Sequence, residues 1–413
     1  MTGPHAGEDA GAAELIGSAD LAAAERAVWP VALRTPTVPC AELSESVGTA
    51  VSLKAECLQS TGSFKLRGAL SRVAALGEAA ERGLVTASAG NHARAVAQAA
   101  RLRGVGCEVF MPRDAPVSKV LAAEALGATV RLDGASVDDA LEQARDLAAE
   151  SGAAFVHPFD DIDVIAGQAT LGSELLADVP DLARVIVPVG GGGLASGIGI
   201  ALRRAGRGVR LIGVQAAACA PYKELLAGRP AGPVSALTIA DGVAVKQPGH
   251  LTLPLLGELL DELLTVEDDQ IADAMVFLAE RTKLVAEGAG AIAVAALMSC
   301  ALEPVAGTTV AIVSGGNVDS GLLASLLLRH ESEEGRRVRI FTRVPDRPGG
   351  LAELLALIAT ARANVVSVEH LREGVPLHVR ETAVELTLET RGPQHTEEVL
   401  GVLAGGGYEA RVA

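Results

Sequence analysis

Short runs of β-branched residues alternate with Ala- and Leu-rich stretches from about residue 20 to about residue 328 of this 413-residue chain. The runs have the length of strands and the stretches between them the length of helices. This alternation predicts βαβ units around largely parallel sheets, an α/β fold. The clearest expected strands are 51–56, 84–89, 107–112, 128–132, 184–189, 209–214 and 309–314.

The C-terminal part follows another pattern. After the polar run ESEEGRR at 331–337, which we interpret as a linker, the order becomes strand, helix, strand, strand, helix, strand. This order over 338–413 predicts a ferredoxin-like βαββαβ domain, small enough to fold as an appended unit. Residues 1–20 are rich in Gly and Ala, and we expect them to form a flexible arm.

Charge and targeting signals narrow the classes of function. The formal net charge of −16 argues against nucleic acid or an anionic membrane as a partner, since both attract cationic surfaces. The N-terminus lacks the apolar segment of a signal peptide, and the longest apolar stretch, 291–302, is too short to span a bilayer. Five scattered cysteines without a C-x-x-C pair suggest neither a disulfide framework nor zinc. We expect a cytoplasmic protein.

Three of the expected strands end in glycine-bearing turns before apolar stretches. The turns are Ser88-Ala89-Gly90-Asn91-His92, the tetraglycine Gly190-Gly191-Gly192-Gly193, and Ser314-Gly315-Gly316-Asn317. Ligands of open α/β sheets collect at the carboxyl ends of strands, where free N–H groups of helix N-termini favour anions. Ordinary helix capping also explains the first turn and a simple turn the third.

The tetraglycine turn is the most specific of the three. Four residues without side chains let backbone amides surround a phosphate, but no Gly-Lys-Ser/Thr follows, so the turn is not a P-loop. Its spacing also fits the dinucleotide fingerprint loosely. The next strand ends in Gln215, where an acidic residue would hold a ribose, which disfavours NAD.

Lys65 is one of only six lysines and follows Phe64 in the turn QSTGSFKLRGAL. A lysine held near apolar groups loses its proton more easily and becomes an amine nucleophile. A solvated surface lysine is the alternative for this residue, as for the other five.

Ser-Phe-Lys-x-Arg-Gly, Ser-x-Gly-Asn-His, the tetraglycine and Ser-Gly-Gly-Asn occur here in this order. Together they resemble the β-family (fold type II) of enzymes that use pyridoxal 5'-phosphate (PLP). Within that family the chain is most similar to threonine dehydratases (threonine ammonia-lyases) with one C-terminal ACT domain. The resemblance covers nearly everything from about residue 20 to the end, and it implies a catalytic domain at 21–330 with a small subdomain at about 58–157.

The resemblance implies a role for each motif. Lys65 forms the Schiff base with PLP, beside Phe64. Asn91 bonds the ring hydroxyl, Gly190 to Gly193 hold the phosphate, Gly242 lies close to the ring, and Ser314 faces the pyridine nitrogen. Ser88, Ala89, Gly90, Asn91 and His92 bind the substrate carboxylate. The catalytic residues are then Lys65 and Ser314.

The implied reaction converts L-threonine to 2-oxobutanoate and ammonia, and L-serine to pyruvate, which connects the chain to isoleucine biosynthesis. A dehydratase for serine or another 3-hydroxy amino acid is the nearest alternative. An inactive PLP or amino-acid sensor and a β-replacement synthase are more distant ones.

Three positions depart from related patterns. Serine racemases of this family have Ser at the position of Ala89, where the hydroxyl acts as acid and base, so Ala89 favours a dehydratase. They also have a metal site that begins with Glu at the position of Gln215, so we expect no metal. Ala169 stands where Gly is expected, and we have no physical account of its effect.

The C-terminal unit resembles an ACT domain. Its expected effector site is the turn Asp346-Arg347-Pro348-Gly349-Gly350-Leu351, for which simple helix capping is the alternative. We expect an amino-acid effector, isoleucine or valine. Because ACT units usually pair across subunits, we also expect a homodimer or homotetramer.

Overall fold

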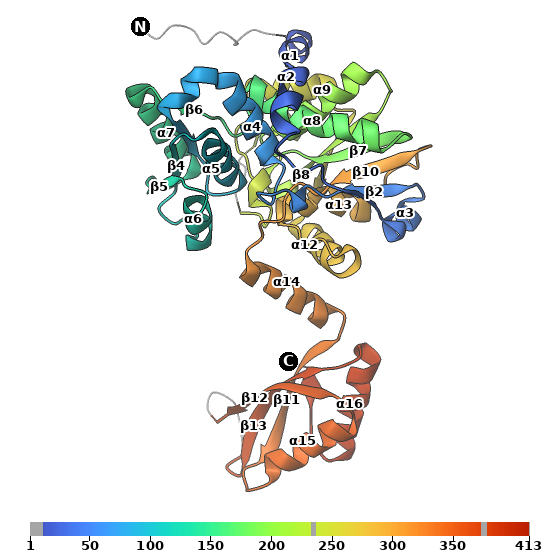
Figure 1. Cartoon of the computed structure of the whole chain (residues 1–413). Helices are drawn as coiled ribbons and strands as arrows, with labels where there is room; N and C mark the ends of the chain where they lie inside the picture. Colours follow the sequence, from blue (N-terminus) through green and yellow to red (C-terminus); the bar gives the residue numbers. More distant parts are fainter. Residues whose placement is uncertain (1–10, 233–236, 373–377, 413) are drawn as a thin grey trace. The chain divides into compact units, whose positions relative to one another are not determined.

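The computed structural model describes residues 11–232, 237–372 and 378–412 (Figure 1). The chain divides into two compact units, Met1–Val318 and Asp319–Ala413. The α/β class predicted from the sequence is confirmed, and each of the seven clearest expected strands is present. No helix among the described residues is long and apolar enough to cross a membrane.

The larger sheet of the first unit has six strands in the order β1-β2-β10-β7-β8-β9. Among these described strands, β1 alone is antiparallel to its neighbour. The strands β7, β8 and β10 are almost entirely buried, as expected of parallel strands covered on both faces. The strands are β1 (Thr37–Pro39), β2 (Val51–Lys54), β7 (Leu182–Pro188), β8 (Arg210–Ala216), β9 (Glu262–Val266) and β10 (Thr308–Ile312).

The smaller sheet is parallel throughout, in the order β5-β4-β3-β6. It lies within the segment 58–157, and helices α5, α6 and α7 surround it (Figure 1). A capping box between Ser136 and Asp139 starts α7. The elements are β3 (Leu84–Ala87), β4 (Cys107–Met111), β5 (Thr129–Leu132), β6 (Ala154–Phe155), α5 (Asn91–Arg103), α6 (Val117–Glu124) and α7 (Val137–Ser151).

The remaining helices of the first unit pack on the larger sheet or join the two sheets. Helix α4 carries Lys65 at its start and contacts both α5 and α8. These helices are α1 (Ala12–Ser18), α2 (Leu21–Val28), α3 (Ala41–Val47), α4 (Lys65–Leu76), α8 (Ile162–Asp178), α9 (Gly193–Ala205), α10 (Pro221–Leu226), α11 (Thr252–Leu259), α12 (Asp268–Phe277) and α13 (Gly288–Ser299).

The expected N-terminal arm differs from the structure in its second half. Residues 1–10 lie outside the described residues, but α1 follows them as a helix. Leu15 of α1 is buried in a cluster with Ile165 and Leu255, which gives this short segment an apolar contact that its composition does not reveal.

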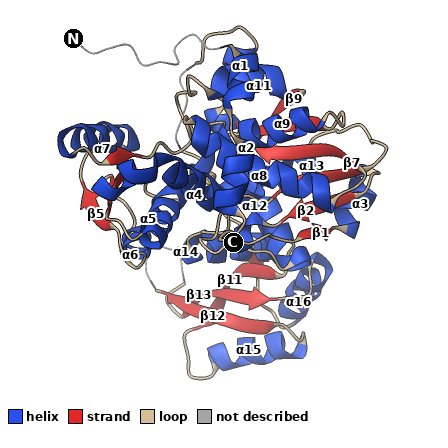
Figure 2. Cartoon of the chain, turned by 45° about the horizontal axis from the view of Figure 1, so that its top comes forward, coloured by secondary structure: helices blue, strands red, loops and turns tan. Residues whose placement is uncertain are grey.

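The second unit has the expected βαββαβ order after a leading helix. Its antiparallel sheet has the order β12-β13-β11-β14, and α15 and α16 pack against it over one core (Figure 2). The elements are α14 (Ser320–Glu333), β11 (Arg337–Pro345), α15 (Gly350–Thr360), β12 (Asn364–Leu371), β13 (Glu381–Glu389), α16 (Pro393–Gly405) and β14 (Arg411–Val412).

The segment 331–337, expected as a linker, is largely part of regular elements. Helix α14 continues to Glu333 and β11 already begins at Arg337. The division between the units falls instead before α14, between Val318 and Asp319. The Asp319 side chain caps α14 and defines its start, whereas the polar composition of 331–337 reflects an exposed last helical turn.

Candidate active site

The lysine motif and the late Ser-Gly-Gly-Asn motif lie against each other. Ser63 forms an isolated antiparallel bridge with Gly315, and the Phe64 N–H donates to the Ser314 carbonyl at 3.1 Å. The Gly316 N–H donates to the Gly62 carbonyl at 2.9 Å. Backbone pairing therefore fixes the start of α4, and with it Lys65, at the carboxyl end of β10.

The Ser-x-Gly-Asn-His motif joins this pair through side chains. Asn317 donates through Nδ2 to the Asn91 Oδ1 at 2.6 Å. Asn91 is the first residue of α5 and follows β3 of the smaller sheet, so this contact connects the carboxyl ends of strands from both sheets.

The tetraglycine turn joins the others through residues 158 and 159. The Lys65 Nζ donates to the Pro158 carbonyl at 2.8 Å, and the adjacent Phe159 ring lies against Gly191 so closely that a Cβ there would come within 2.2 Å of it. Gly193 begins α9, whose free N–H groups face the turn. The structure thus brings all four motifs together around Lys65.

Lys65 has the environment of an amine nucleophile. Desolvation lowers the pKa of its ammonium to about 8, and the negative charge of Glu287 opposes this shift. The Phe64 ring centroid lies 5.3 Å from the Lys65 Nζ. At neutral pH an appreciable fraction of Lys65 is therefore unprotonated and able to attack a carbonyl carbon.

The substrate-binding residues expected at 88–92 do not all face the same way. The Gly90 N–H donates to the Ser88 Oγ at 3.1 Å, which shapes the turn, and Ala89 and Gly90 are partly exposed. The His92 ring is buried against the Val156 carbonyl, and desolvation lowers its pKa to about 3. The His92 imidazole is accordingly neutral and packs into the small subdomain instead of the turn.

Ser314 and Gly242 lie near the start of α13. The buried Ser314 hydroxyl donates a hydrogen bond to the Ala289 carbonyl at 3.2 Å, and a hydroxyl can rotate to donate to another acceptor instead. A Cβ at Gly242 would lie 2.9 Å from that of Ala289. Gly242 therefore permits the segment around it to approach α13 closely.

Glu287 is a functional candidate that sequence reasoning missed. It is buried and accepts a hydrogen bond from the Asn91 Nδ2 at 2.5 Å. Burial and the nearby charge of Asp241 raise the pKa of its carboxyl to about 7. The only signal in the sequence is an acid directly before the small-residue run GAGAIAVAA, where an ordinary helix cap is an equally good explanation.

Comparison with known proteins agrees with this geometry. Residues 28–315 match the family described as pyridoxal-phosphate dependent enzyme, and residues 338–405 match the ACT domain. The chain belongs to the pyridoxal-phosphate dependent enzyme family. The threonine-dehydratase-type resemblance and the fold type II assignment made from the motifs are confirmed with it.

Two relatives of this PLP-dependent enzyme match nearly its whole length, and two solved structures match more than three quarters of it. It is 45% identical to an L-threonine ammonia-lyase of Thermotoga maritima, over 95% of this chain and 98% of that one. It is 44% identical to an L-threonine ammonia-lyase of Geobacter sulfurreducens, over 91% and 94%. A structure of threonine deaminase isoform 2 from Solanum lycopersicum has a TM-score of 0.71 at 33% identity, over 79% and 89%. A maize serine racemase structure has a TM-score of 0.71 at 34% identity, over 77% and 99%.

The residues at this site fit PLP. The tetraglycine turn and the N-terminus of α9 present backbone amides that would suit the phosphate of the cofactor. The hydroxyls of Ser63 and Ser196 are buried without a hydrogen-bond partner among the described residues, which is unusual for polar atoms inside a protein. Lys65 would supply the amine, and Ser314 would supply a hydroxyl that can rotate.

Gln215, at the position where serine racemases begin a metal site, makes a hydrogen bond within the protein. Gln215 is fully buried, and its Oε1 accepts from the Lys223 N–H at 3.0 Å. Within the described part of the chain, no group of three or more His, Cys, Asp or Glu side chains is arranged to hold a metal ion.

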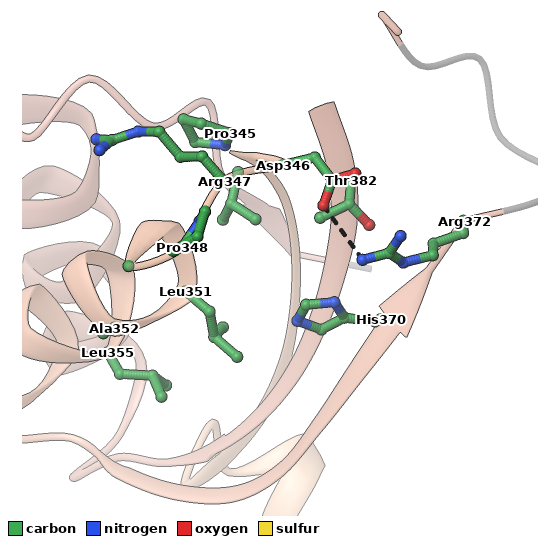
Figure 3. Close-up of a pocket in the computed structure, with 12 residues that line it drawn as sticks. Pro345, Asp346, Arg347, Pro348, Leu351, Ala352, Leu355, His370, Arg372 and Thr382 are labelled. Carbon is green, nitrogen blue, oxygen red and sulfur yellow. Dashed lines mark hydrogen bonds and ion pairs between the residues drawn. The ribbon is translucent and has the colours of Figure 1, made fainter. Parts of the chain in front are cut away.

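The ACT domain has a cavity of about 540 Å³ at the turn between β11 and α15 (Figure 3). Of the six residues expected at this site, Asp346, Arg347, Pro348, Gly349 and Leu351 line the cavity and Gly350 does not. The structure adds Leu355 from the next turn of α15. From farther along the chain it adds His370 of β12, Arg372 directly after that strand, and Thr382 of β13.

The charged groups of this cavity are ordered by ion pairs. The Arg372 guanidinium lies 3.2 Å from the Asp346 Oδ1, whereas Arg347 turns away to pair with Glu353 at 3.0 Å (Figure 3). The ion pair of Arg372 and Asp346 therefore borders a space whose walls also include the apolar side chains of Leu351 and Leu355.

Proposed function

We propose that this PLP-dependent enzyme is an L-threonine ammonia-lyase that forms 2-oxobutanoate and ammonia, and that it also converts L-serine to pyruvate. The position of Lys65, an amine with a lowered pKa at the junction of all four motifs, carries the proposal. The two full-length relatives named L-threonine ammonia-lyase support threonine as the substrate.

When bound, PLP withdraws electrons from the substrate Cα. Lys65 serves as the base that removes the Cα proton, and its lowered pKa matches this task near neutral pH. The N–H groups at the Ser88–Asn91 turn and the start of α5 bind the substrate carboxylate. The β-hydroxyl leaves as water with the proton that Lys65 removed from Cα, and the released enamine takes up one water molecule as it hydrolyses to the 2-oxo acid and ammonia.

Ala89 supports elimination over racemisation. Racemisation needs a second acid on the opposite face of Cα, and a methyl group at this turn cannot hold a proton. We therefore take the likeness to a serine racemase structure as a likeness of fold.

We also propose that the ACT cavity binds an amino-acid effector, isoleucine or valine. Arg372 would pair with its carboxylate and Asp346 with its ammonium, while Leu351 and Leu355 would contact a branched apolar side chain. A homodimer or homotetramer and a cytoplasmic location stay predictions from the sequence.

The experiment that tests the function is an assay of 2-oxo acid formation from threonine, serine and their hydroxylated analogues. We expect the highest kcat/KM with threonine. Lys65→Ala should lose both turnover and the visible absorbance of the bound cofactor while keeping its circular dichroism spectrum. Normal turnover in that variant would refute the role of Lys65. A preference for serine or another 3-hydroxy amino acid would support the alternative dehydratase, and no turnover with PLP bound would support a sensor.

A further inference from the structure

A chain of four polar side chains crosses the active site from Arg94 to Glu287. The Arg94 Nη1 donates to the Asn317 Oδ1 at 2.5 Å, Asn317 donates to the Asn91 Oδ1 at 2.6 Å, and Asn91 donates to the Glu287 Oε1 at 2.5 Å. The protein has only three asparagines, and two of them occupy the middle of this row.

The direction of these hydrogen bonds follows from chemistry. An arginine can only donate, so the atom of Asn317 that faces Arg94 must be its oxygen. The Asn317 nitrogen also donates to the backbone carbonyl of Thr61 at 2.9 Å, and a carbonyl can only accept. Two partners with fixed roles thus determine the orientation of the Asn317 amide.

The orientation of the Asn317 amide determines that of the Asn91 amide. Because the Asn317 nitrogen faces Asn91, the Asn91 amide must turn its oxygen toward Asn317 and its nitrogen toward Glu287. One N–H of Asn91 is used by the Glu287 carboxylate, and the second stays available within the site.

Glu287 and two glycines are arranged around this row. Glu287 is the N-cap residue of α13, yet its side chain makes no capping hydrogen bond and turns to Asn91 instead. A Cβ at Gly315 would lie 2.2 Å from the Glu287 Oε1, and a Cβ at Gly62 would lie 2.3 Å from the Asn317 Oδ1. Gly315 of the late Ser-Gly-Gly-Asn motif and Gly62, directly before the lysine motif, therefore leave the space that this row occupies.

We propose that Arg94, Asn317 and Glu287 are positioning residues that orient the Asn91 amide, so that it presents an N–H, and not its oxygen, to the ring oxygen of PLP. This inference rests on the proposed function and on the expectation, taken from the family resemblance, that the Asn91 side chain bonds the ring oxygen of PLP. An unconstrained amide could present either atom, and its oxygen would repel the ring oxygen once that hydroxyl is ionised.

The test compares the affinity of the apoprotein for PLP in Asn317→Ala and Asn317→Asp. Removing the constraint should weaken binding about tenfold, the usual scale for a hydrogen bond to a charged group. Asn317→Asp should weaken it further, since an acceptor at that place reverses the preferred orientation of Asn91. Both variants should shift the pH midpoint of the bound cofactor's absorbance. Asn364→Ala, which removes an exposed amide bonded to Glu389 in the ACT domain, is the matched control and should change neither quantity.

A double-mutant cycle separates positioning from a general effect on folding. If Asn317 acts through Asn91, Asn317→Ala should change PLP affinity less than about twofold in an Asn91→Ala background. Additive losses, or an Asn317→Ala variant equal to the control, would overturn the proposal. If Asn317→Ala fails to fold by circular dichroism, Arg94→Met replaces it in the same cycle with the same criteria. If wild-type protein binds no PLP, the proposed function fails together with this inference. If wild-type protein binds PLP and turns over threonine while the cycle is additive, only the inference fails.

Discussion

Four charged side chains form a buried cluster beside the first turn of α4, the helix that begins at Lys65, and join this helix to the larger sheet. Arg67 lies 2.7 Å from Glu174 and 2.9 Å from Glu56, and Lys54 lies 2.7 Å from Glu174. All four side chains are almost completely inaccessible to solvent. Two positive and two negative charges balance within the cluster, and the arginine pairing holds the pKa of Glu56 below its usual range.

Glu174→Ala would leave this cluster with one excess positive charge in the interior. Breaking a buried pair by removing one partner costs about 3–5 kcal/mol, because the remaining charge is desolvated and unpaired. Asp178 compensates little, since it lies 3.5 Å from Lys54 and is itself partly exposed. We therefore expect the free energy of unfolding of the first unit to fall by about 3–5 kcal/mol, a large share of the usual 5–15 kcal/mol.

The measurement is urea unfolding followed by circular dichroism, with Glu258→Ala as the control. Glu258 pairs with Arg203 at 2.9 Å, but both side chains are about half exposed, so its loss should cost about 0–1 kcal/mol. Lys54→Met combined with Glu174→Leu removes one charge of each sign and should recover most of the loss. Equal costs for Glu174→Ala and Glu258→Ala, or no recovery in the double variant, would refute the reasoning.

Three other predictions concern activity. The rate at which the apoprotein binds PLP should rise with pH through about 8, because the lowered pKa of Lys65 makes its neutral amine available at lower pH. Stopped-flow absorbance measures this rate, and a midpoint near the ordinary lysine pKa would contradict the prediction. Wild-type enzyme should form no appreciable D-serine from L-serine, and Ala89→Ser should increase the rate of racemisation. Chiral analysis after long incubation is the assay, and D-serine forming as fast as pyruvate in the wild type would disprove our acid–base assignment. Arg372→Ala should keep the basal threonine rate but lose the response to isoleucine or valine, since Arg372 is the one arginine that faces Asp346 in the cavity among the described residues. Initial rates with and without each amino acid test this, and an unchanged response would exclude Arg372 from effector binding.

Local sequence was sufficient to predict most of the elements, whereas the kind of cofactor site was implied by the resemblance of four ordered motifs to the family of PLP enzymes. Strand lengths, helix stops and apolar periodicity are local properties, so the alternation from residue 20 onward predicted an α/β fold and the pattern after it the βαββαβ unit. The motifs around Lys65, Asn91, Gly190 and Ser314 were readable because each combines a turn with a distinctive chemistry. Local pattern was misleading where an element begins or ends: the Gly/Ala-rich residues after 10 form α1, and the polar residues after 330 continue α14.

Which side chains meet depends on the folded chain. Asn317 contacts Asn91 across 226 positions, and Glu174 contacts Lys54 across 120, so no window of sequence contains either pair. Side-chain direction was equally undetermined, because the same turn points Asn91 into the site and His92 into the core. A carboxylate such as Glu287 has an ordinary pKa in an unfolded chain, and its value of about 7 arises only when folding buries it beside Asp241.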